Sequence, residues 1–211
     1  MTHTHFSDLV AGYHRFRAEE WPREHARWAR LSHGQSPKVM VIACSDSRVD
    51  PATIFGTHPG EVFVVRNIAN LVPPFEIGGG RHGVSAALEF AVTQLEVEEI
   101  VVMGHGACGG VHAAFSHRFA GAPPGAGGFI AHWVDLLDDA RTRIVAQYGH
   151  GPEAIHALEL ETVRVSIANL RTFPCIPERE EKGLLTIHGA YFAIADGVLH
   201  VMDERGNFAP A

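Results

Sequence analysis

The sequence predicts an α/β fold: a mostly parallel four-stranded sheet with an antiparallel edge strand, helices on both faces and an N-terminal helical arm. Three observations favour this class. Short apolar runs alternate with segments of helical periodicity, as in sheets whose parallel strands are joined by helices. The runs are apolar at successive positions, which is typical of strands covered on both faces. The last two strands are separated only by a turn at Asp196-Gly197, which favours an antiparallel pair.

The first forty residues are predicted to be helical, because the apolar residues from Phe6 to Tyr13 recur at helical spacing. Pro22 is expected to end or restart this helix. We expect one domain over residues 1–211, in which residues 1–35 form an arm with an apolar stripe. Such a stripe must be covered, either by a partner subunit or by the chain's own sheet.

The remaining elements follow in order. Strands are expected at 39–43, 61–66, 100–103, 184–187 and 198–202. Asp50 and Pro51 open a short helix, with Asp as its cap and Pro in its first turn. Longer helices are expected at 84–95, 129–147 and 153–171.

The composition excludes some classes of function. The chain has 211 residues, of which 46% are apolar and 19% charged, so it can build a core. Its formal net charge is −7 and it has no run of Lys or Arg, which argues against a nucleic-acid partner. With no signal peptide and no long apolar stretch, we expect a cytoplasmic chain without a membrane partner. Three cysteines, an odd number, favour metal ligands or nucleophiles over a disulfide framework.

Two motifs follow predicted strands. Cys44 and Asp46 come directly after the first strand, and His105 and Cys108 flank a Gly-rich turn after the third. Sites in parallel sheets gather beyond the carboxyl ends of the strands, so these side chains are expected to meet. Two thiolates, one imidazole and a fourth position that is open or filled by a carboxylate are typical of catalytic zinc.

The fourth position decides the chemistry. If Asp46 ligates the metal, the site is blocked; if water does, zinc makes hydroxide available near neutral pH. Arg48 lies two residues beyond Asp46 and offers a bidentate partner for its carboxylate. We therefore hypothesise that Arg48 holds Asp46 off the metal, where it orients the zinc-bound hydroxide.

Three other interpretations fit parts of the pattern. The first is a closed structural zinc site. The second is a dinucleotide fingerprint, Gly104-x-Gly106-x-x-Gly109, but the acidic residue expected about 20 positions later falls in a Pro/Gly-rich loop at 123–128. The third is a nucleophilic cysteine with His105 as its base, which leaves the second cysteine and Asp46 without a role.

In combination, the motifs resemble those of β-class carbonic anhydrases over about residues 30–203. The matching segments are Cys44-Ser45-Asp46-Ser47-Arg48-Val49, residues 59–70, residues 104–110 and His188-Gly189-Ala190-Tyr191-Phe192. The chain is most similar to the plant-like branch. Val41 stands where the bicarbonate-inhibited branch usually carries tryptophan, so an accessible zinc is expected at neutral pH.

The resemblance implies one zinc ion per subunit, bound by Cys44, His105 and Cys108, with Asp46 and Arg48 as a catalytic dyad. It implies a hydro-lyase that reversibly hydrates carbon dioxide to bicarbonate and a proton through zinc-bound hydroxide. It also implies a homodimer or tetramer, in which the N-terminal helices embrace the neighbouring subunit. Two alternatives remain: hydrolysis of an analogue such as carbonyl sulfide, and a non-catalytic bicarbonate- or redox-responsive binding protein.

The resemblance also implies a substrate pocket. Gln35 would donate a hydrogen bond to substrate from across the dimer interface. Phe63, Ile68 and Phe90 would form a dry wall, which suits a small apolar substrate. Backbone N–H groups near Gly106 would stabilise charge that develops on oxygen.

Overall fold

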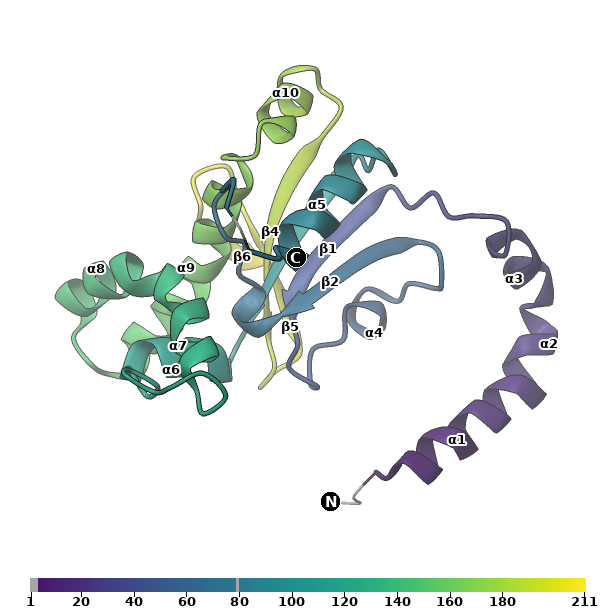
Figure 1. Cartoon of the computed structure of the whole chain (residues 1–211), viewed down its shortest axis with the longest axis horizontal. Helices are drawn as coiled ribbons and strands as arrows, with labels where there is room; N and C mark the ends of the chain where they lie inside the picture. The colour runs from purple at the N-terminus through teal and green to yellow at the C-terminus, as the bar shows by residue number, and fades with distance from the viewer. Residues whose placement is uncertain (1–3, 79) are drawn as a thin grey trace. The chain divides into compact units, whose positions relative to one another are not determined.

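The computed structural model describes residues 4–78 and 80–211, so the first three residues of the predicted arm lie outside it. The chain divides into two compact units, Met1–Ser36 and Pro37–Ala211. Figure 1 shows the course of the chain, and each unit is described by itself.

The first unit is helical, as predicted. Its elements are α1 (Phe6–Arg15), a π-helical turn (Phe16–Glu20), α2 (Trp21–Arg23) and α3 (His25–Leu31). The helix is interrupted at Glu24, two residues after Pro22. Trp21 and Trp28 stack with ring centroids 5.5 Å apart, and Phe16 lies edge-on to both. Within this unit the apolar residues of α1 are exposed, so the unit does not cover its own stripe.

The second unit is built on one six-stranded sheet with the order β2-β1-β3-β4-β5-β6. The strands are β1 (Val39–Cys44), β2 (Val62–Asn67), β3 (Glu99–His105), β4 (Thr186–Ala193), β5 (Val198–Met202) and β6 (Phe208–Pro210). The first four in the spatial order are parallel, β5 is antiparallel to β4, and β6 is antiparallel to β5. This confirms the predicted α/β class. The sheet has one strand more than expected, because the short β6 pairs with β5 and ends in Pro210 at the open edge, where a missing N–H is tolerated.

The helices connect these strands. They are α4 (Pro51–Phe55), α5 (Gly83–Thr93), α6 (Gly109–Ser116), α7 (Gly128–Val134), α8 (Asp138–Tyr148), α9 (Pro152–Leu170) and α10 (Cys175–Glu181), with 3₁₀ turns at Ile68–Asn70 and Asp135–Leu137. The carboxylate of Asp50 caps α4 by accepting from the N–H of Thr53 at 3.0 Å, as its position predicted. The single helix expected at 129–147 is divided in two by the turn at Asp135–Leu137. Among the described residues, none of these helices is long and apolar enough to cross a membrane.

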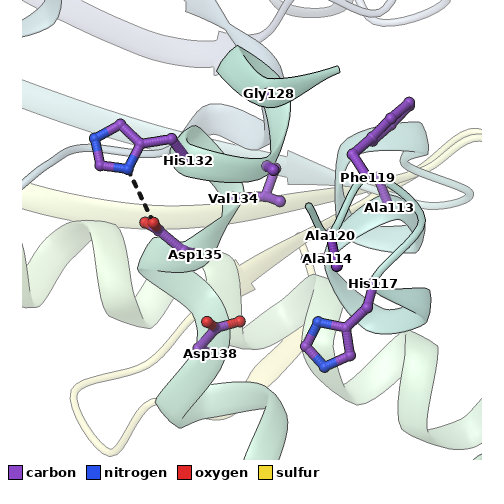
Figure 2. A pocket seen from close by; sticks show the side chains of 11 residues that line it. Ala113, Ala114, His117, Phe119, Ala120, Gly128, His132, Val134, Asp135 and Asp138 are labelled. Carbon is purple, nitrogen blue, oxygen red and sulfur yellow. Dashed lines mark hydrogen bonds and ion pairs between the residues drawn. The ribbon is translucent and has the colours of Figure 1, made fainter. Parts of the chain in front are cut away.

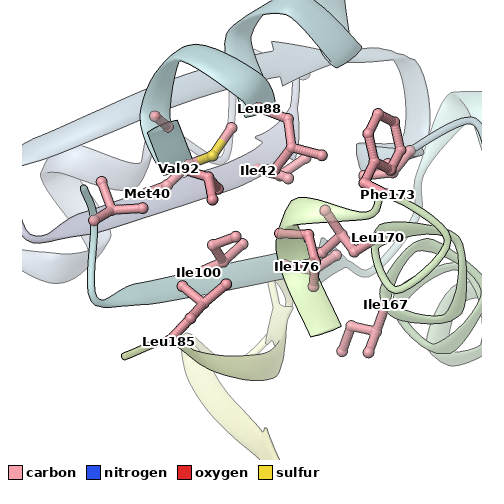
Figure 3. Packing of buried hydrophobic residues seen from close by; sticks show 14 of the residues in the cluster. Met40, Ile42, Leu88, Val92, Ile100, Ile167, Leu170, Phe173, Ile176 and Leu185 are labelled. Atoms are coloured by element: carbon pink, nitrogen blue, oxygen red, sulfur yellow. The ribbon is translucent and has the colours of Figure 1, made fainter. Parts of the chain in front are cut away.

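The core covers β1 on both faces. Met40 and Ile42 pack with residues of α5, α9 and α10, such as Leu88 and Leu170 (Figure 3). Val41 and the other alternate residues of β1 face the opposite side, where Ile54 and Phe55 of α4 pack against them. A strand buried in this way has no freedom to shift its register, so the side chains at its carboxyl end are held in fixed directions.

Candidate metal centre

Three buried side chains converge beyond the carboxyl ends of β1 and β3. Cys44 ends β1, His105 ends β3, and Cys108 lies at the start of α6. Their ligand atoms all lie within 4.8 Å of one another, and the two Sγ atoms are 3.9 Å apart. The three residues are no more than 4% exposed. The parallel register brings them together. Ala43 pairs with Met103, so the residues that follow on β1 and β3 lie at the same end of the sheet.

The orientation of His105 fits a metal. Its Nδ1 lies 2.9 Å from the carbonyl oxygen of Gly106, so the Nδ1–H donates there and Nε2 is left as the basic nitrogen. Nε2 is buried, and among residues 4–78 and 80–211 no group is within hydrogen-bond geometry of it. A buried imidazole nitrogen without a partner costs free energy unless an ion or water satisfies it. Two thiols and this nitrogen form a donor set that suits zinc.

The two thiols share a hydrogen bond. A hydrogen bond from Cys108 lowers the pKa of Cys44, because it stabilises the thiolate. The same contact, with burial, raises the pKa of Cys108. Such a pair is poised to bind a divalent cation, which replaces the shared proton with a charge that both sulfurs can bind.

Asp46 is held by Arg48 through two parallel hydrogen bonds. Arg48 Nε donates to Asp46 Oδ1 at 2.9 Å and Nη2 donates to Oδ2 at 2.6 Å, while the backbone N–H of Arg48 also reaches Oδ1 at 3.0 Å. These bonds hold the pKa of Asp46 well below its usual range. The carboxylate is therefore charged at physiological pH, and both of its oxygens are oriented by one guanidinium.

Arg66 fixes the backbone that carries Cys44 and Asp46. Its Nε donates to the carbonyl of Cys44 at 2.9 Å, and its Nη2 donates to the carbonyl of Asp46 at 2.6 Å. The N–H of Ser45 donates to the carbonyl of Asn67 on β2 at 2.7 Å. The sequence shows Arg66 within a matching segment but does not indicate this role, because the role depends on the pairing of β1 with β2.

The segment between His105 and Cys108 has an unusual backbone. Ala107 has a φ of 54°, a left-handed conformation that residues with a Cβ rarely adopt. Its carbonyl accepts from Arg48 Nη2 at 3.0 Å. The N–H of Gly106 donates to the carbonyl of Phe192 at 3.0 Å and is already used in this way. A contact between Gly106 and a substrate stays a prediction.

Glu159 of α9 lies behind this segment and was not identified from the sequence. Its Oε1 accepts from the N–H of Cys108 at 3.2 Å, and its Oε2 accepts from the hydroxyl of Tyr191 at 2.9 Å. Burial and the neighbouring carboxylate raise the pKa of Tyr191, so its phenol stays a donor. The signal in the sequence was an acidic residue next to Leu158, on the face of α9 that also carries Thr162 and Val163.

A cavity of about 280 Å³ opens beside the ligands. Its lining includes Cys44, Asp46, Ile68, Ala113, Phe119 and Ile130. Ile68 lines this cavity, and its contact with a substrate stays a prediction. Phe63 and Phe90 instead pack on each other, with ring centroids 6.0 Å apart, and neither belongs to this lining.

Phe63 pairs with Met40, four residues before Cys44 along β1. Gln35 belongs to the first unit. The contacts of Phe63, Phe90 and Gln35 with a substrate stay predictions.

A second cavity, of about 330 Å³, shares Ala113 and Phe119 with the first. Figure 2 shows His117 and Asp138 facing it, while His132 turns toward Asp135, which it contacts at 3.0 Å. These four side chains do not form a metal-ligating group; within residues 4–78 and 80–211, Cys44, His105 and Cys108 are the one such group.

Comparisons with known proteins agree with this geometry. The carbonic anhydrase family model matches residues 39–199. The chain is 38% identical over 200 residues to the mitochondrial β-carbonic anhydrase 6 of Arabidopsis thaliana, covering 92% of this chain and 68% of the relative. It is 37% identical over 193 residues to the chloroplastic β-carbonic anhydrase 5 of the same plant, covering 90% of this chain and 62% of the relative.

Solved structures are similar over nearly the whole chain. The β-carbonic anhydrase CcaA matches with a TM-score of 0.89 at 31% identity, covering 98% of this chain and 92% of that one. A structure from a study of two tetrameric β-carbonic anhydrases of the ascomycete Sordaria macrospora matches with a TM-score of 0.80 at 31% identity, covering 93% and 96%.

These comparisons correct one expectation and establish the family. The cytoplasmic location expected from the sequence is contradicted, because the two plant relatives are named as mitochondrial and chloroplastic proteins. The absence of a recognisable signal was a poor guide to the compartment. The family match over residues 39–199, the identity to the plant proteins and the shared fold lead to one conclusion: this chain belongs to the β-class carbonic anhydrases, a family of enzymes.

Proposed function

We propose that this chain reversibly hydrates carbon dioxide to bicarbonate and a proton, with one zinc ion per subunit bound by Cys44 Sγ, His105 Nε2 and Cys108 Sγ. The observation that carries the proposal is the separation of roles at the sheet edge. Three buried ligand atoms converge, while both oxygens of the nearby carboxylate bind a guanidinium. When bound in a three-ligand site, zinc lowers the pKa of a coordinated water toward neutrality and so supplies hydroxide.

Asp46 orients the attacking oxygen. A charged carboxylate accepts a hydrogen bond from the nucleophile and so aims its lone pair at the substrate carbon. Arg48 serves this role in two ways: it keeps Asp46 charged, and it removes the rotational freedom of the carboxylate. Arg66 supports the same arrangement from behind, because it binds the backbone carbonyl of Asp46.

The cavity beside the ligands suits the substrate. Carbon dioxide is small and apolar, and Ile68, Phe119 and Ile130 present it with apolar side chains next to Cys44 and Asp46. The remaining pocket residues expected from the family, Gln35, Phe63 and Phe90, would complete the pocket in an assembly of subunits. Their position relative to the cavity in such an assembly is part of this proposal.

We further propose a homodimer or tetramer. Phe6 is 79% exposed and Leu9 is 61% exposed on α1, although both lie on one helical stripe. Exposed apolar stripes of this kind are covered by a partner in stable assemblies. The Sordaria macrospora relatives are described as tetrameric, which is consistent with this arrangement.

Stopped-flow measurement of carbon dioxide hydration tests the function. We expect rapid hydration by zinc-loaded protein, loss of that activity after removal of the metal with a chelator, and recovery when zinc is restored. A Cys108→Ser variant should bind zinc weakly and show little activity. Hydration no faster than the uncatalysed rate in a protein that holds zinc at full occupancy would contradict the proposal.

A further inference from the structure

The segment that carries Cys108 is held from two sides. On the outer side, Arg48 donates to the carbonyl of Ala107, the residue with the left-handed backbone. On the inner side, the N–H of Cys108 donates to Oε1 of Glu159 at 3.2 Å. A left-handed conformation strains the backbone of a residue that carries a Cβ. The conformation therefore persists only if neighbouring groups hold it, and these two contacts do so.

Glu159 is an unusual residue for its position. It is only 5% exposed, on a helix face that otherwise packs into the core. A carboxylate buried there is costly unless hydrogen bonds satisfy it, and a leucine would pack at lower cost. Its partners are the N–H of Cys108, the hydroxyl of Tyr191 and, at 3.6 Å, Nδ1 of the half-exposed His156. An apolar residue could make none of these contacts, and the one to Cys108 is the one that reaches a predicted metal ligand.

Gly106, the residue after the metal ligand His105, leaves room for the side chain of Tyr191 because it has no Cβ. A Cβ on Gly106 would lie 3.0 Å from the Tyr191 hydroxyl, so the phenol packs directly beneath the segment. Gly104 has a similar effect on α9, since a Cβ there would lie 2.9 Å from Val163 Cγ2. The absence of these two side chains lets the phenol and the helix that carries Glu159 approach the metal ligands closely.

We propose that Glu159 is a positioning residue for the metal centre. Its carboxylate holds the N–H of Cys108, and thereby the direction of the Cys108 sulfur toward Cys44 and His105, while Tyr191 holds the carboxylate. Ligands that are oriented before the metal arrives lose less freedom on binding it, so zinc stays bound longer. This inference rests on the metal site proposed above and adds a residue that supports it.

The test compares the wild type with its variants by two readouts. One is the rate of zinc release to a chromophoric chelator, and the other is the visible absorption of the cobalt-substituted protein. Glu159→Leu should release zinc about 10- to 100-fold faster and alter the cobalt spectrum, because the N–H of Cys108 loses its acceptor. Glu159→Gln keeps an oxygen in the same place and should restore most of the wild-type behaviour. Tyr191→Phe, which frees the carboxylate, should speed release by a smaller factor.

Ser166→Ala is the matched control. Ser166 is also buried on α9, where its hydroxyl donates to the carbonyl of Asn70 at 3.0 Å and not to the segment that carries Cys108. It should leave zinc release and the cobalt spectrum unchanged. The proposal is overturned if Glu159→Leu behaves like wild type or if Ser166→Ala changes both readouts equally.

If Glu159→Leu does not fold, unchanged zinc release in Tyr191→Phe overturns the proposal as well. Wild-type protein that binds no zinc would instead contradict the proposed function. A zinc-loaded, active wild type together with an unaffected Glu159→Leu variant would contradict only the role of Glu159.

Discussion

Arg48 links the two motifs of the metal centre through its contacts with Asp46 and Ala107. The guanidinium donates to both oxygens of the Asp46 carboxylate, at 2.9 and 2.6 Å, and the same Nη2 donates to the Ala107 carbonyl at 3.0 Å. One side chain thus binds the carboxylate that follows β1 and the strained backbone that follows β3. Changes at Arg48 are therefore expected to affect both the direction of Asp46 and the geometry of Cys108.

Replacing Arg48 with Ala should lower the hydration rate constant by about 10- to 100-fold, the usual effect of removing a group that orients a metal site. Asp46 becomes free to rotate toward the metal and to block the open position. The hydration rate constant of Arg48→Lys should lie between those of the wild type and Arg48→Ala, because lysine restores the charge but not the two parallel hydrogen bonds. Stopped-flow hydration of zinc-loaded proteins checks the order; normal turnover in Arg48→Ala would exclude this role.

The adjacent glycines at the start of α6 should differ in their tolerance of a side chain. A Cβ on Gly110 would lie 2.6 Å from Ile68 Cγ2, whereas a Cβ on Gly109 would meet nothing within 4 Å. Gly110→Ala should reduce the free energy of unfolding by about 1–3 kcal/mol, as overpacking does. Gly109→Ala should change it by about 0.5 kcal/mol or less. Urea denaturation of both zinc-loaded variants measures the difference, and equal stabilities would contradict the packing described here.

The exposed stripe of α1 should control assembly. Leu9→Glu places a charge on the stripe that we propose to be covered by a neighbouring subunit, and it should shift the protein toward smaller species. Ala11→Glu adds the same charge to the same helix, off that stripe. Light scattering after size-exclusion chromatography gives the masses. A stripe that does not contribute to assembly would leave both variants with the wild-type mass.

Much of this fold can be predicted from the sequence because its signals are local. The continuous apolar run of β1 reflects burial on both faces, and the Asp50-Pro51 pair marks the start of α4. β6 gives no such signal, because three residues ending in proline become a strand only by pairing with β5. The break at Asp135–Leu137 was missed for a similar reason: the residues on both sides keep helical periodicity.

The metal ligands and the Asp46–Arg48 pair could also be predicted, since they lie in two short motifs, 44–48 and 105–108, that each follow a predicted strand. Glu159, Tyr191 and Arg66 were not assigned roles, because their partners lie on other elements. The packing of Phe63 on Phe90 likewise depends on tertiary structure, because Phe63 lies on β2 and Phe90 on α5. Spacing along the chain identifies the ligands of a site, whereas the groups that orient those ligands depend on tertiary packing.

Zinc K-edge X-ray absorption of the wild type and of Asp46→Asn tests most directly whether Asp46 lies off the metal. We expect two sulfur neighbours at about 2.3 Å and nitrogen or oxygen neighbours at about 2.0–2.1 Å, with the same shell in both proteins. Asp46→Asn should nevertheless hydrate carbon dioxide slowly. A metal shell that changes when Asp46 is replaced, or one with fewer than two sulfurs, would contradict the division between three ligands and an orienting carboxylate.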